Sequence, residues 1–471
     1  MHVGFASAAP VSIPSTTLPT NGQVVAGTAS ISSSSTATSA TININQTSQR
    51  AVVNWDSFNV GANATVNFNQ PNAQAVTLNR VTGGSASVIN GALHANGQVI
   101  LVNSNGVTFG KGSEVNAAAV TASTLNMADQ EFMNGNTSFK DDGTGSGAHA
   151  GKITNKGNIQ TTGIGGYIAL LAPEVRNQGV LIAQKGGTVA LGSGSQITLT
   201  IQGQSLIALK VDEGVYNGLI SNKHLIEAPG GLVVLAASAA NPLFASVIQN
   251  TGRISASSMF NRGGVIELVA NTVTQAGRVQ ADSSTSQGGQ VNLVGQTIAV
   301  ASNSQTTATG ATAGGQVNIG LAQSAVSGGA QINTPSPAAI RANANTAAQN
   351  SQLAQTVTIA QNATIDTSAT QAGNGGTIAI WSQVQTTIAG ILKSMGGAIS
   401  GNGGFVETSS KGVVSFGQGL VVNTLAPNGK AGTWLIDPLS ITIDNVSASM
   451  LSSVLSTSNV SLNAEIGRAH V

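Results

Sequence analysis

The sequence predicts an all-β chain that coils into a parallel β-helix, with a cap at its N-terminal end and small β-hairpins outside the coil. The first supporting observation is composition, because only 7% of the 471 residues are charged and 58 are glycine. Stacked parallel strands place equivalent positions above one another, and uncharged polar residues tolerate this better than charged ones. With 41% hydrophobic residues and 11 prolines, the chain also lacks the composition of a disordered protein.

The second and third observations are a recurrent Gly-Gly phrase and the alternation of apolar residues that follows it. The phrase begins at Gly165, Gly186, Gly230, Gly263, Gly288, Gly314, Gly375 and Gly403. Most neighbouring starts lie roughly 20–30 residues apart, a period typical of a solenoid. We predict that the wider gaps, 186–230 and 314–375, each hold two turns. Alternation directs every second side chain inward, and the glycine pairs should permit tight corners and close strand approach.

A β-propeller and a β-sandwich are the competing architectures. A propeller needs about 40 residues and four strands per blade, with a signature that this chain lacks. A sandwich needs hairpin turns, and the pairs Asn96-Gly97 and Asn105-Gly106 are typical of such turns. These pairs suggest one local hairpin outside the coil, whereas the long array of Gly-Gly phrases favours the β-helix.

Three segments interrupt the strand pattern. Residues 129–151 hold much of the local charge and glycine, and we predict that they leave the coil. Residues 303–313 and 326–355 are rich in Ser, Thr, Ala and Asn and are predicted to be loops.

Both ends of the chain are predicted to lie outside the fold. Residues 1–9 resemble the remnant of an export signal, because residues 6–9 form a small-residue cleavage pattern. Residues 465–471 resemble the conceptual translation of a sequencing adaptor. We interpret them as an artefact at the end of a fragment of a longer protein.

Charge and cysteine content limit the classes of partner. A net charge of +1 argues against nucleic acid as a partner, because phosphate binding needs clustered Lys and Arg. The chain has no cysteine, so no disulfide locks it before export. A long solenoid has a continuous core and does not need disulfides. No apolar run reaches the roughly 18–20 residues that span a bilayer.

A β-helical carbohydrate enzyme is an alternative function, and it would need two carboxylates facing each other. The acidic pairs Asp141-Asp142 and Asp212-Glu213 are sequence neighbours, whose side chains point to opposite faces of a strand. We interpret them as solvated loop or edge charges. The scattered histidines, without metal-ligand spacing, include His94, His149 and His224. We therefore expect no enzyme activity, cofactor or metal site in this chain.

An aromatic cluster, Trp55, Phe58 and Phe68, lies near the start of the strand pattern. A ligand-binding role is one interpretation. The favoured one is that these rings cap the open end of the solenoid, where free strand edges would otherwise template aggregation.

Residues 51–127 contain a series of uncommon short sequence motifs in a fixed order. The motifs are Asn54-Trp55-x-x-Phe58-Asn59-Val60, Val66-x-Phe68-x-Gln70, Ala75-Val76-x-Leu78-Asn79-Arg80-Val81, Gly91-x-Leu93-x-Ala95-Asn96-Gly97-Gln98-Val99, Asn103-x-Asn105-Gly106-Val107, Phe109-Gly110 and Thr121-Ala122-Ser123-Thr124-Leu125. In these motifs the chain closely resembles the haemagglutination-activity (TPS) domain that opens the exoproteins of bacterial two-partner secretion systems, including filamentous-haemagglutinin-like adhesins.

The resemblance implies a right-handed β-helix whose first domain is recognised by a dedicated outer-membrane transporter of the Omp85-like class. It implies a secretion domain at residues 10–260 and shaft repeats at 261–464, in a protein secreted through the periplasm to the cell surface. It implies a transporter-recognition motif made of Asn103, Ser104, Asn105, Gly106 and Val107. It also implies a capping and folding nucleus made of Trp55, Phe58, Asn59, Phe68, Asn79 and Arg80.

One position departs from the family pattern, because Ser104 stands where the family usually has proline. Proline would stiffen this corner, and serine adopts the same turn at a cost below about 1 kcal/mol. The resemblance leaves open whether the whole protein is an adhesin, a haemolysin or a contact-dependent toxin. The host-cell or bacterial receptor is not indicated by the sequence.

Overall fold

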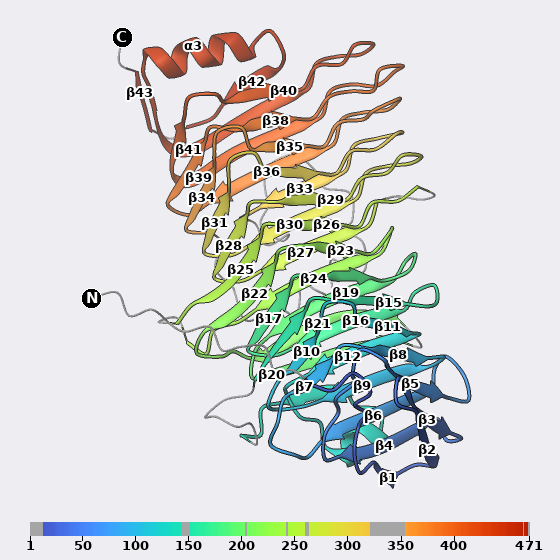
Figure 1. Cartoon of the computed structure of the whole chain (residues 1–471). Helices are drawn as coiled ribbons and strands as arrows, with labels where there is room; N and C mark the ends of the chain where they lie inside the picture. Colours follow the sequence, from blue (N-terminus) through green and yellow to red (C-terminus); the bar gives the residue numbers. More distant parts are fainter. Residues whose placement is uncertain are drawn as a thin grey trace.

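The structure of the protein is a computed structural model, which describes residues 13–143, 151–202, 205–241, 244–259, 263–320, 354–464 and 466–469. Residues 1–9, interpreted as a signal remnant, and His149 lie outside these ranges. Of the predicted artefact, only 466–469 are described, as a strand. The chain forms an elongated coil, with the N-terminal strands at one end and the C-terminal strands at the other (Figure 1).

Each turn of the coil contributes strands to three columns, which we number first, second and third in the order in which the chain visits them. The first column contains β4 (Arg50–Trp55), β6 (Val76–Val81), β9 (Gln98–Val102), β12 (Ala119–Ser123), β16 (Tyr167–Leu171), β19 (Thr188–Ser193), β24 (Leu232–Ala237), β27 (Val265–Val269), β30 (Gln290–Val294), β33 (Gln316–Ile319), β36 (Thr377–Ser382), β39 (Phe405–Phe416), β41 (Thr433–Ile443) and β42 (Asn459–Leu462). The second column contains β7 (Ser87–Ile89), β10 (Val107–Phe109), β14 (Lys152–Asn155), β17 (Glu174–Asn177), β22 (Gly218–Asn222), β25 (Ser246–Asn250), β28 (Thr272–Gln275), β31 (Thr297–Val300), β34 (Thr356–Ile359), β37 (Gln385–Ile388) and β43 (Ile466–Ala469). The third column contains β3 (Ala40–Gln46), β5 (Ala64–Asn69), β8 (Ala92–Ala95), β11 (Glu114–Ala117), β15 (Asn158–Thr161), β18 (Val180–Ile182), β23 (Leu225–Glu227), β26 (Arg253–Ser255), β29 (Arg278–Gln280), β32 (Gln305–Thr307), β35 (Thr364–Asp366), β38 (Ile391–Lys393) and β40 (Val421–Asn423).

All stacked neighbours within these columns pair in parallel, so the predicted parallel β-helix is confirmed. The first and second columns, together with the N-terminal strand β1, form one 26-stranded sheet, because β39 and β41 run through both columns. Alternate residues of each strand enter a continuous apolar interior, as Ile266 and Leu268 of β27 do. At the N-terminal end of the coil the pairing is antiparallel, with β1 (Gln23–Ala26) against β4 and β2 (Ala29–Ser35) against β3. These two strands cover the first turn.

The second glycine of the Gly-Gly phrase explains why the phrase recurs. A Cβ atom added at Gly289 would lie 2.1 Å from the carbonyl oxygen of Gly264, one turn earlier. One added at Gly264 would lie 2.1 Å from the oxygen of Gly231. The same relation continues through Gly315 and Gly376. Successive turns therefore touch backbone to backbone along this corner, and any side chain there would separate them.

The predictions for the two wide gaps were wrong. Strand β19 pairs directly with β24, and β33 pairs directly with β36, so each gap spans a single turn. The first gap holds an inserted hairpin, β20 (Gln196–Gln202) and β21 (Ser205–Glu213). The predicted loop at 303–313 was also wrong, since it contains β32 and further pairs through Gly310 and Ala313. Most of the predicted loop at 326–355 lies outside the described residues.

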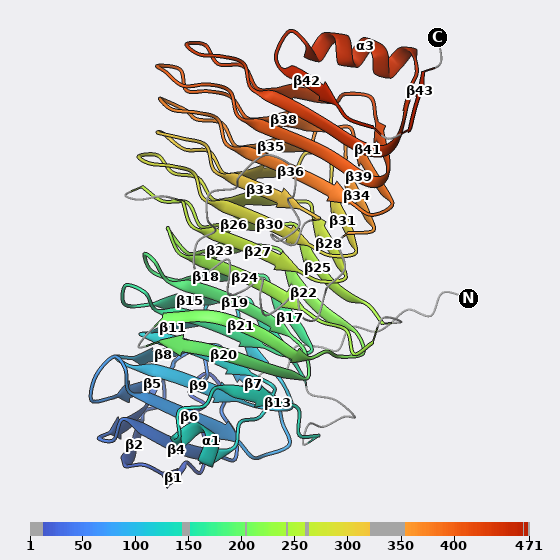
Figure 2. The ribbon, with the colours of Figure 1, turned by 180° about the vertical axis from the view of Figure 1, so that it is seen from behind.

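The hairpin suggested by Asn96-Gly97 and Asn105-Gly106 was wrong as well, because these pairs are corners between columns. The hairpins outside the coil are instead made by β20 and β21, with β13 (Ser138–Lys140) added as a third antiparallel strand. Figure 2 shows this small sheet and helix α1 (Asp129–Met133) beside the lower part of the coil. The predicted departure of 129–151 from the coil is thus confirmed for its described part.

These inserted elements bury the outer side of the first column. The second apolar cluster joins Leu78 and Ile100 of the coil to Phe132 of α1, Phe139 of β13 and Leu209 of β21. The early turns therefore have apolar cores on both sides of one sheet. A second helix in the described part of the chain, α3 (Asn445–Val454), packs at the C-terminal end of the coil (Figure 1). No helix among the described residues is long and apolar enough to span a membrane.

Candidate functional site

The predicted recognition motif lies at the corner between β9 and β10, and its first residue is fully buried. Asn103 Nδ2 donates to the carbonyl oxygen of Ser85 at 3.0 Å and to Ser87 Oγ at 2.9 Å. Asn103 Oδ1 accepts a hydrogen bond from the backbone N–H of Asn105 at 3.0 Å. The Asn103 N–H donates to the oxygen of Ser123, one turn later. Asn103 therefore joins three successive turns of the coil.

The rest of the motif completes a tight turn. The Gly106 N–H donates to Asn103 O at 3.0 Å, and Gly106 has a φ of +119°, which L side chains rarely adopt. An added Cβ there would also lie 3.1 Å from the oxygen of Lys152. Half-buried Asn105 donates through Nδ2 to Gly83 O, and Val107 is a buried residue of the interior. The motif residues are thus brought together as one structural corner.

Ser104 occupies the second position of this turn, and its carbonyl oxygen accepts the Gly151 N–H at 2.7 Å. Proline is favoured at this position because its fixed φ matches the turn. We expect Ser104→Pro to raise the free energy of unfolding by about 0.5 kcal/mol, chiefly by restricting the unfolded chain. Urea denaturation of the two proteins measures this difference. A loss of stability would show that the corner does not hold the φ that proline requires.

The aromatic residues fill the interior directly beneath the N-terminal strands. Trp55 and Phe58 are buried, with ring centroids 5.6 Å apart and planes at 87°, an edge-to-face contact. The indole Nε1 of Trp55 donates to buried Asn79 Oδ1 at 3.1 Å. Phe68 of β5 belongs to the same interior cluster. Asn59 Oδ1 accepts the N–H of Val88 at 2.8 Å, which ties this turn to the next.

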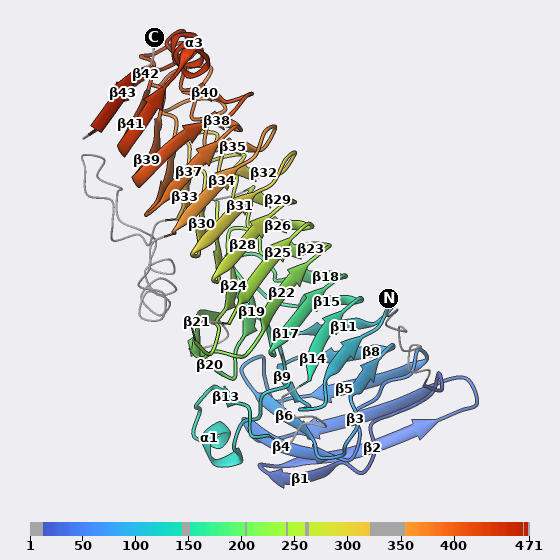
Figure 3. The same ribbon diagram turned by 90° about the vertical axis from the view of Figure 1, so that its left-hand side faces the viewer.

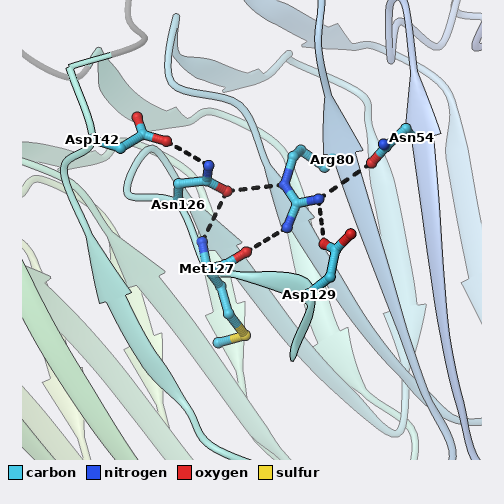
Figure 4. A network of polar contacts seen from close by, with 6 residues as sticks. All are labelled: Asn54, Arg80, Asn126, Met127, Asp129 and Asp142. Atoms are coloured by element: carbon cyan, nitrogen blue, oxygen red, sulfur yellow. Dashed lines mark hydrogen bonds and ion pairs between the residues drawn. The ribbon is translucent and has the colours of Figure 1, made fainter. Parts of the chain in front are cut away.

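Arg80 is the most heavily bonded of the predicted nucleus residues, and it points away from the interior (Figure 4). Its guanidinium donates to Asn54 Oδ1 at 3.3 Å, Asn126 Oδ1 at 3.0 Å and the carbonyl oxygen of Met127, and it pairs with Asp129 at 2.5 Å. Arg80 thereby fastens the start of the inserted segment, including α1, to the early turns. The sequence motif that contains Arg80 did not predict the pairing with Asp129, which lies 49 residues away.

Arg80→Met keeps the aliphatic stem but removes every one of these donors. We expect it to lower the free energy of unfolding by about 2 kcal/mol, because the oxygens of Asn126 and Met127 lose a charged donor. We also expect limited proteolysis to cut within residues 126–143 faster than in the wild type. Lys140→Met, which removes an exposed pair at 3.9 Å with Glu213, is the control and should change neither quantity measurably. Equal effects of the two variants would contradict the role given to Arg80.

The acidic pairs weighed as catalytic candidates have partners of their own in the structure. Asp212 accepts from Thr198 Oγ1 at 2.6 Å and pairs with Lys210 at 2.8 Å. Asp142 accepts from the amide of Asn126 at 2.5 Å. Within the described ranges, no group of three or more His, Cys, Asp or Glu residues is arranged to hold a metal ion.

The structure does bring together polar residues that sequence reasoning missed, and a buried amide ladder is the longest example. Each amide donates to the next one toward the C-terminus: Asn155 to Asn177 at 2.9 Å, Asn177 to Asn222 at 2.8 Å, Asn222 to Asn250 at 2.8 Å and Asn250 to Gln275 at 2.7 Å. Each new turn therefore supplies the acceptor that the previous amide needs. The signal in the sequence is an Asn or Gln at the end of five consecutive second-column strands, β14 to β28.

Glu267 was also missed. It lies on the side of β27 opposite the interior and is fully buried. Its Oε1 accepts from Asn292 Nδ2 at 3.1 Å, and Asn292 in turn accepts from Asn318 at 2.9 Å. Its Oε2 has no hydrogen-bond partner. Burial raises the pKa of Glu267 to about 8, and the hydrogen bond from Asn292 only partly opposes this shift.

A carboxylate pair from adjacent turns lies further along the same column. Ser409 of β39 is in register with Asp437 of β41, and Glu407 lies two residues before Ser409. Burial raises the pKa of Glu407, the hydrogen bond from Ser409 opposes the shift, and Asp437 adds to it. The pair could be found in the sequence only by aligning the two strand phrases in their stacking register.

Comparison with known proteins decides what this coil is. A family model, described as TPS secretion domain, matches residues 11–281, more than half of the chain. The chain belongs to the TPS secretion domain family. TPS domains imply a dedicated outer-membrane transporter, and TPS exoproteins are secreted. The resemblance read from residues 51–127 is confirmed.

Three proteins that this TPS domain resembles come from Haemophilus influenzae. The chain is 33% identical over 256 residues, 54% of its length, to a heme/hemopexin-binding protein of strain ATCC 51907 / DSM 11121 / KW20 / Rd, and it covers 27% of that protein. It is 39% identical over 109 residues, 23% of its length, to a second heme/hemopexin-binding protein, of which it covers 11%. The crystal structure of the HMW1 secretion domain superimposes with a TM-score of 0.70 at 26% identity, covering 89% of this chain and all of that one. The TPS domain thus spans about a quarter or less of the curated relatives it matches. These relatives are secretion domains and exoproteins.

Proposed function

We propose that this chain directs the export of a longer exoprotein through a dedicated outer-membrane transporter of the Omp85-like class and forms the first part of a cell-surface adhesin shaft. The match of residues 11–281 to the TPS family carries the export role. The shaft role is supported by the continuous stacking of all three columns from β5 to β40, well beyond that match. In this proposal, residues 10–260 form the secretion domain and 261–464 the shaft.

The proposed mechanism is physical. The chain has few charges and no cysteine, so it can cross the periplasm unfolded without premature cross-links. The turn around Trp55 and Asn79 folds first outside the cell and later turns stack on it. Along the amide ladder, each added turn supplies the acceptor oxygen for the amide donor of the turn before it. Because stacking releases free energy turn by turn, folding outside would pull export forward.

The Asn103–Val107 corner is the proposed address that the transporter reads in the unfolded chain. The burial of Asn103 supports recognition before folding, because its side chain is accessible to the transporter only in the unfolded chain. Asn103→Asp retains the size of the side chain but removes the Nδ2 donor to Ser85 and Ser87. We expect exported protein to fall at least about tenfold, while refolded Asn103→Asp keeps its coil by far-UV circular dichroism.

The test uses the full chain behind a standard export signal, expressed in a Gram-negative host with and without a two-partner transporter from the same genome. Protein in the medium and on the cell surface is compared with protein in the periplasm. Export only with the transporter supports the proposal. Equal export without it would overturn the proposal, and undiminished export of folded Asn103→Asp would remove the address role alone.

The names of the first relatives give a second candidate for the whole protein, binding of heme or hemopexin. The chain covers only 27% of the first of these proteins, so the binding region of such a protein need not lie within this chain. A heme titration of the purified chain, followed by its visible absorption spectrum, tests whether this part takes up the ligand. The haemolysin and contact-dependent toxin alternatives differ from the adhesin in regions beyond this chain and are tested only with the full reading frame.

A further inference from the structure

Five basic side chains lie along the corner between the second and third columns. We call Lys111, Lys156, Lys223, Arg253 and Arg278 the basic ridge. The three lysines occupy the corners that follow β10, β14 and β22, and the two arginines begin β26 and β29. All five are exposed. Figure 3 shows the strands on the two sides of this corner, β14 to β28 beside β11 to β29, stacked in an almost straight series.

The register of the coil sets the spacing of the ridge. Glu114, Asn158, Val180, Leu225, Arg253 and Arg278 are stacked partners in successive turns. With neighbouring strands about 4.8 Å apart, the ridge is roughly 24 Å long. Arg253 and Arg278 are direct neighbours in this stack. Like charges that face each other across paired strands are unfavourable, and the strand registers of the described residues contain no other such pair.

The side chains of the ridge differ from several other basic side chains of the coil in having no partner within the protein. Within the part of the chain that the structure describes, none of its five side chains makes an ion pair or a hydrogen bond. Arg80, Arg176 and Lys210, by contrast, each pair with a carboxylate. Among the described residues, the side chains of half-buried Lys393 and exposed Lys430 also make no ion pair, and both lie farther along the chain, separate from the ridge.

Little acidic charge offsets the ridge. Glu114 is the carboxylate on the same corner, and it accepts from Asn116 at 2.6 Å. A shallow groove of about 610 Å³ runs beside the ridge, lined by Lys111, Lys156 and His224 together with Ser113 and Glu114. Because the whole chain has a net charge of only +1, this concentration leaves the remainder close to neutral or slightly acidic. Basic charge without a paired carboxylate is therefore concentrated along this corner, which raises the local positive potential.

We propose that the basic ridge binds the phosphate groups of an anionic membrane surface, so that the coil lies along the outer leaflet after export. A straight ridge of separated charges lets all five cations meet a planar array of phosphates at once, whereas a compact ligand would reach only two or three. The ridge lies entirely within residues 111–278, inside the matched TPS domain. That the surface is the cell's own outer leaflet rests on the proposed export, but the binding of phosphate headgroups does not.

The test is co-sedimentation of the full chain with vesicles in which about a third of the lipid is phosphatidylglycerol and the rest phosphatidylcholine, compared with pure phosphatidylcholine vesicles. Binding is measured at about 0.05 M and about 0.5 M salt, since surface attraction is screened at high salt. Each basic residue near such a surface contributes about a fivefold gain in partitioning. We expect Arg253→Gln/Arg278→Gln to lower binding about 25-fold and Lys111→Gln/Lys156→Gln/Lys223→Gln to lower it about 100-fold.

The matched control is Lys393→Gln/Lys430→Gln, which also removes two lysines that make no ion pair, one half-buried and one exposed, and it should stay within about twofold of the wild type. All variants are first shown to keep the wild-type circular dichroism spectrum. Binding to pure phosphatidylcholine, or equal losses in ridge and control variants, would overturn the proposal. So would displacement by millimolar inorganic phosphate, which indicates a single-phosphate site, or equal binding to polygalacturonate, a polyanion without phosphate. None of these outcomes depends on whether the chain is exported.

Discussion

Gly289→Ala is expected to lower the free energy of unfolding by about 3 kcal/mol, and by more if the coil cannot relax. The new Cβ would lie 2.1 Å from the carbonyl oxygen of Gly264 and 2.6 Å from a backbone carbon of Gly263. Both obstacles are backbone atoms, so no side-chain rotation can remove the clash. Relief requires separation of two turns, and it weakens the ladder bonds between β27 and β30. Urea denaturation followed by far-UV circular dichroism measures the loss.

Gly163→Ala is the matched control for Gly289→Ala. Gly163 lies at the corner between β15 and β16, and an added Cβ would meet nothing within 4 Å. Its substitution should leave stability unchanged or raise it slightly, because alanine restricts the unfolded chain. If both variants lost the same stability, glycine at these corners would be required for backbone conformation alone, and the account of close stacking would be wrong.

Glu267→Gln should make the chain more stable at pH 8 by about 2 kcal/mol. The folded-state pKa of Glu267, about 8, lies above its ordinary value of 4.5, so the folded chain holds a proton that the unfolded chain releases. The stability from this group is therefore fully present below about pH 4.5 and is lost as the pH rises toward 8. Glutamine keeps the acceptor for Asn292 and cannot ionise. The amide NH2 of glutamine would replace Glu267 Oε2, which has no hydrogen-bond partner, and a buried NH2 without an acceptor limits the gain in stability.

Denaturation midpoints between pH 4.5 and 8 test this prediction. The wild type should lose stability across that window, while Glu267→Gln should show a smaller slope and equal the wild type near pH 4.5. Glu114→Gln, at an exposed carboxylate, is the control and should keep the wild-type slope. A variant with the wild-type slope would show that another group carries the pH dependence.

The sequence predicted the coil because alternating apolar strands and Gly-Gly corners can each be recognised within a short stretch of chain. It failed where identical local patterns have different partners. Residues 196–213 alternate like coil strands, yet they pair with each other as a hairpin. Residues 305–307, Gln-Thr-Thr, contain no apolar residue, yet backbone bonds to the neighbouring turns make them a strand.

The same distinction applies to the candidate site. The words around Asn103 predicted a corner, and the structure places a corner there. Burial of Asn103 could not be predicted, because it depends on turns that end at Ser85 and Ser123. The ion pair between Arg80 and Asp129 likewise forms only when residues distant in the sequence are brought together by the fold. The same is true of the basic ridge. Corners can be predicted from residues that are neighbours in the sequence, whereas surfaces such as the basic ridge depend on the strand register over many turns.

The central claim is that the address for export lies in the TPS domain and that the following turns are cargo. The most direct measurement compares two fragments, residues 11–281 and residues 282–464, each behind the same export signal and expressed with the same transporter. The account predicts that 11–281 reaches the medium or cell surface and that 282–464 stays in the periplasm. Export of 282–464, or retention of 11–281 while the full chain is exported, would contradict it.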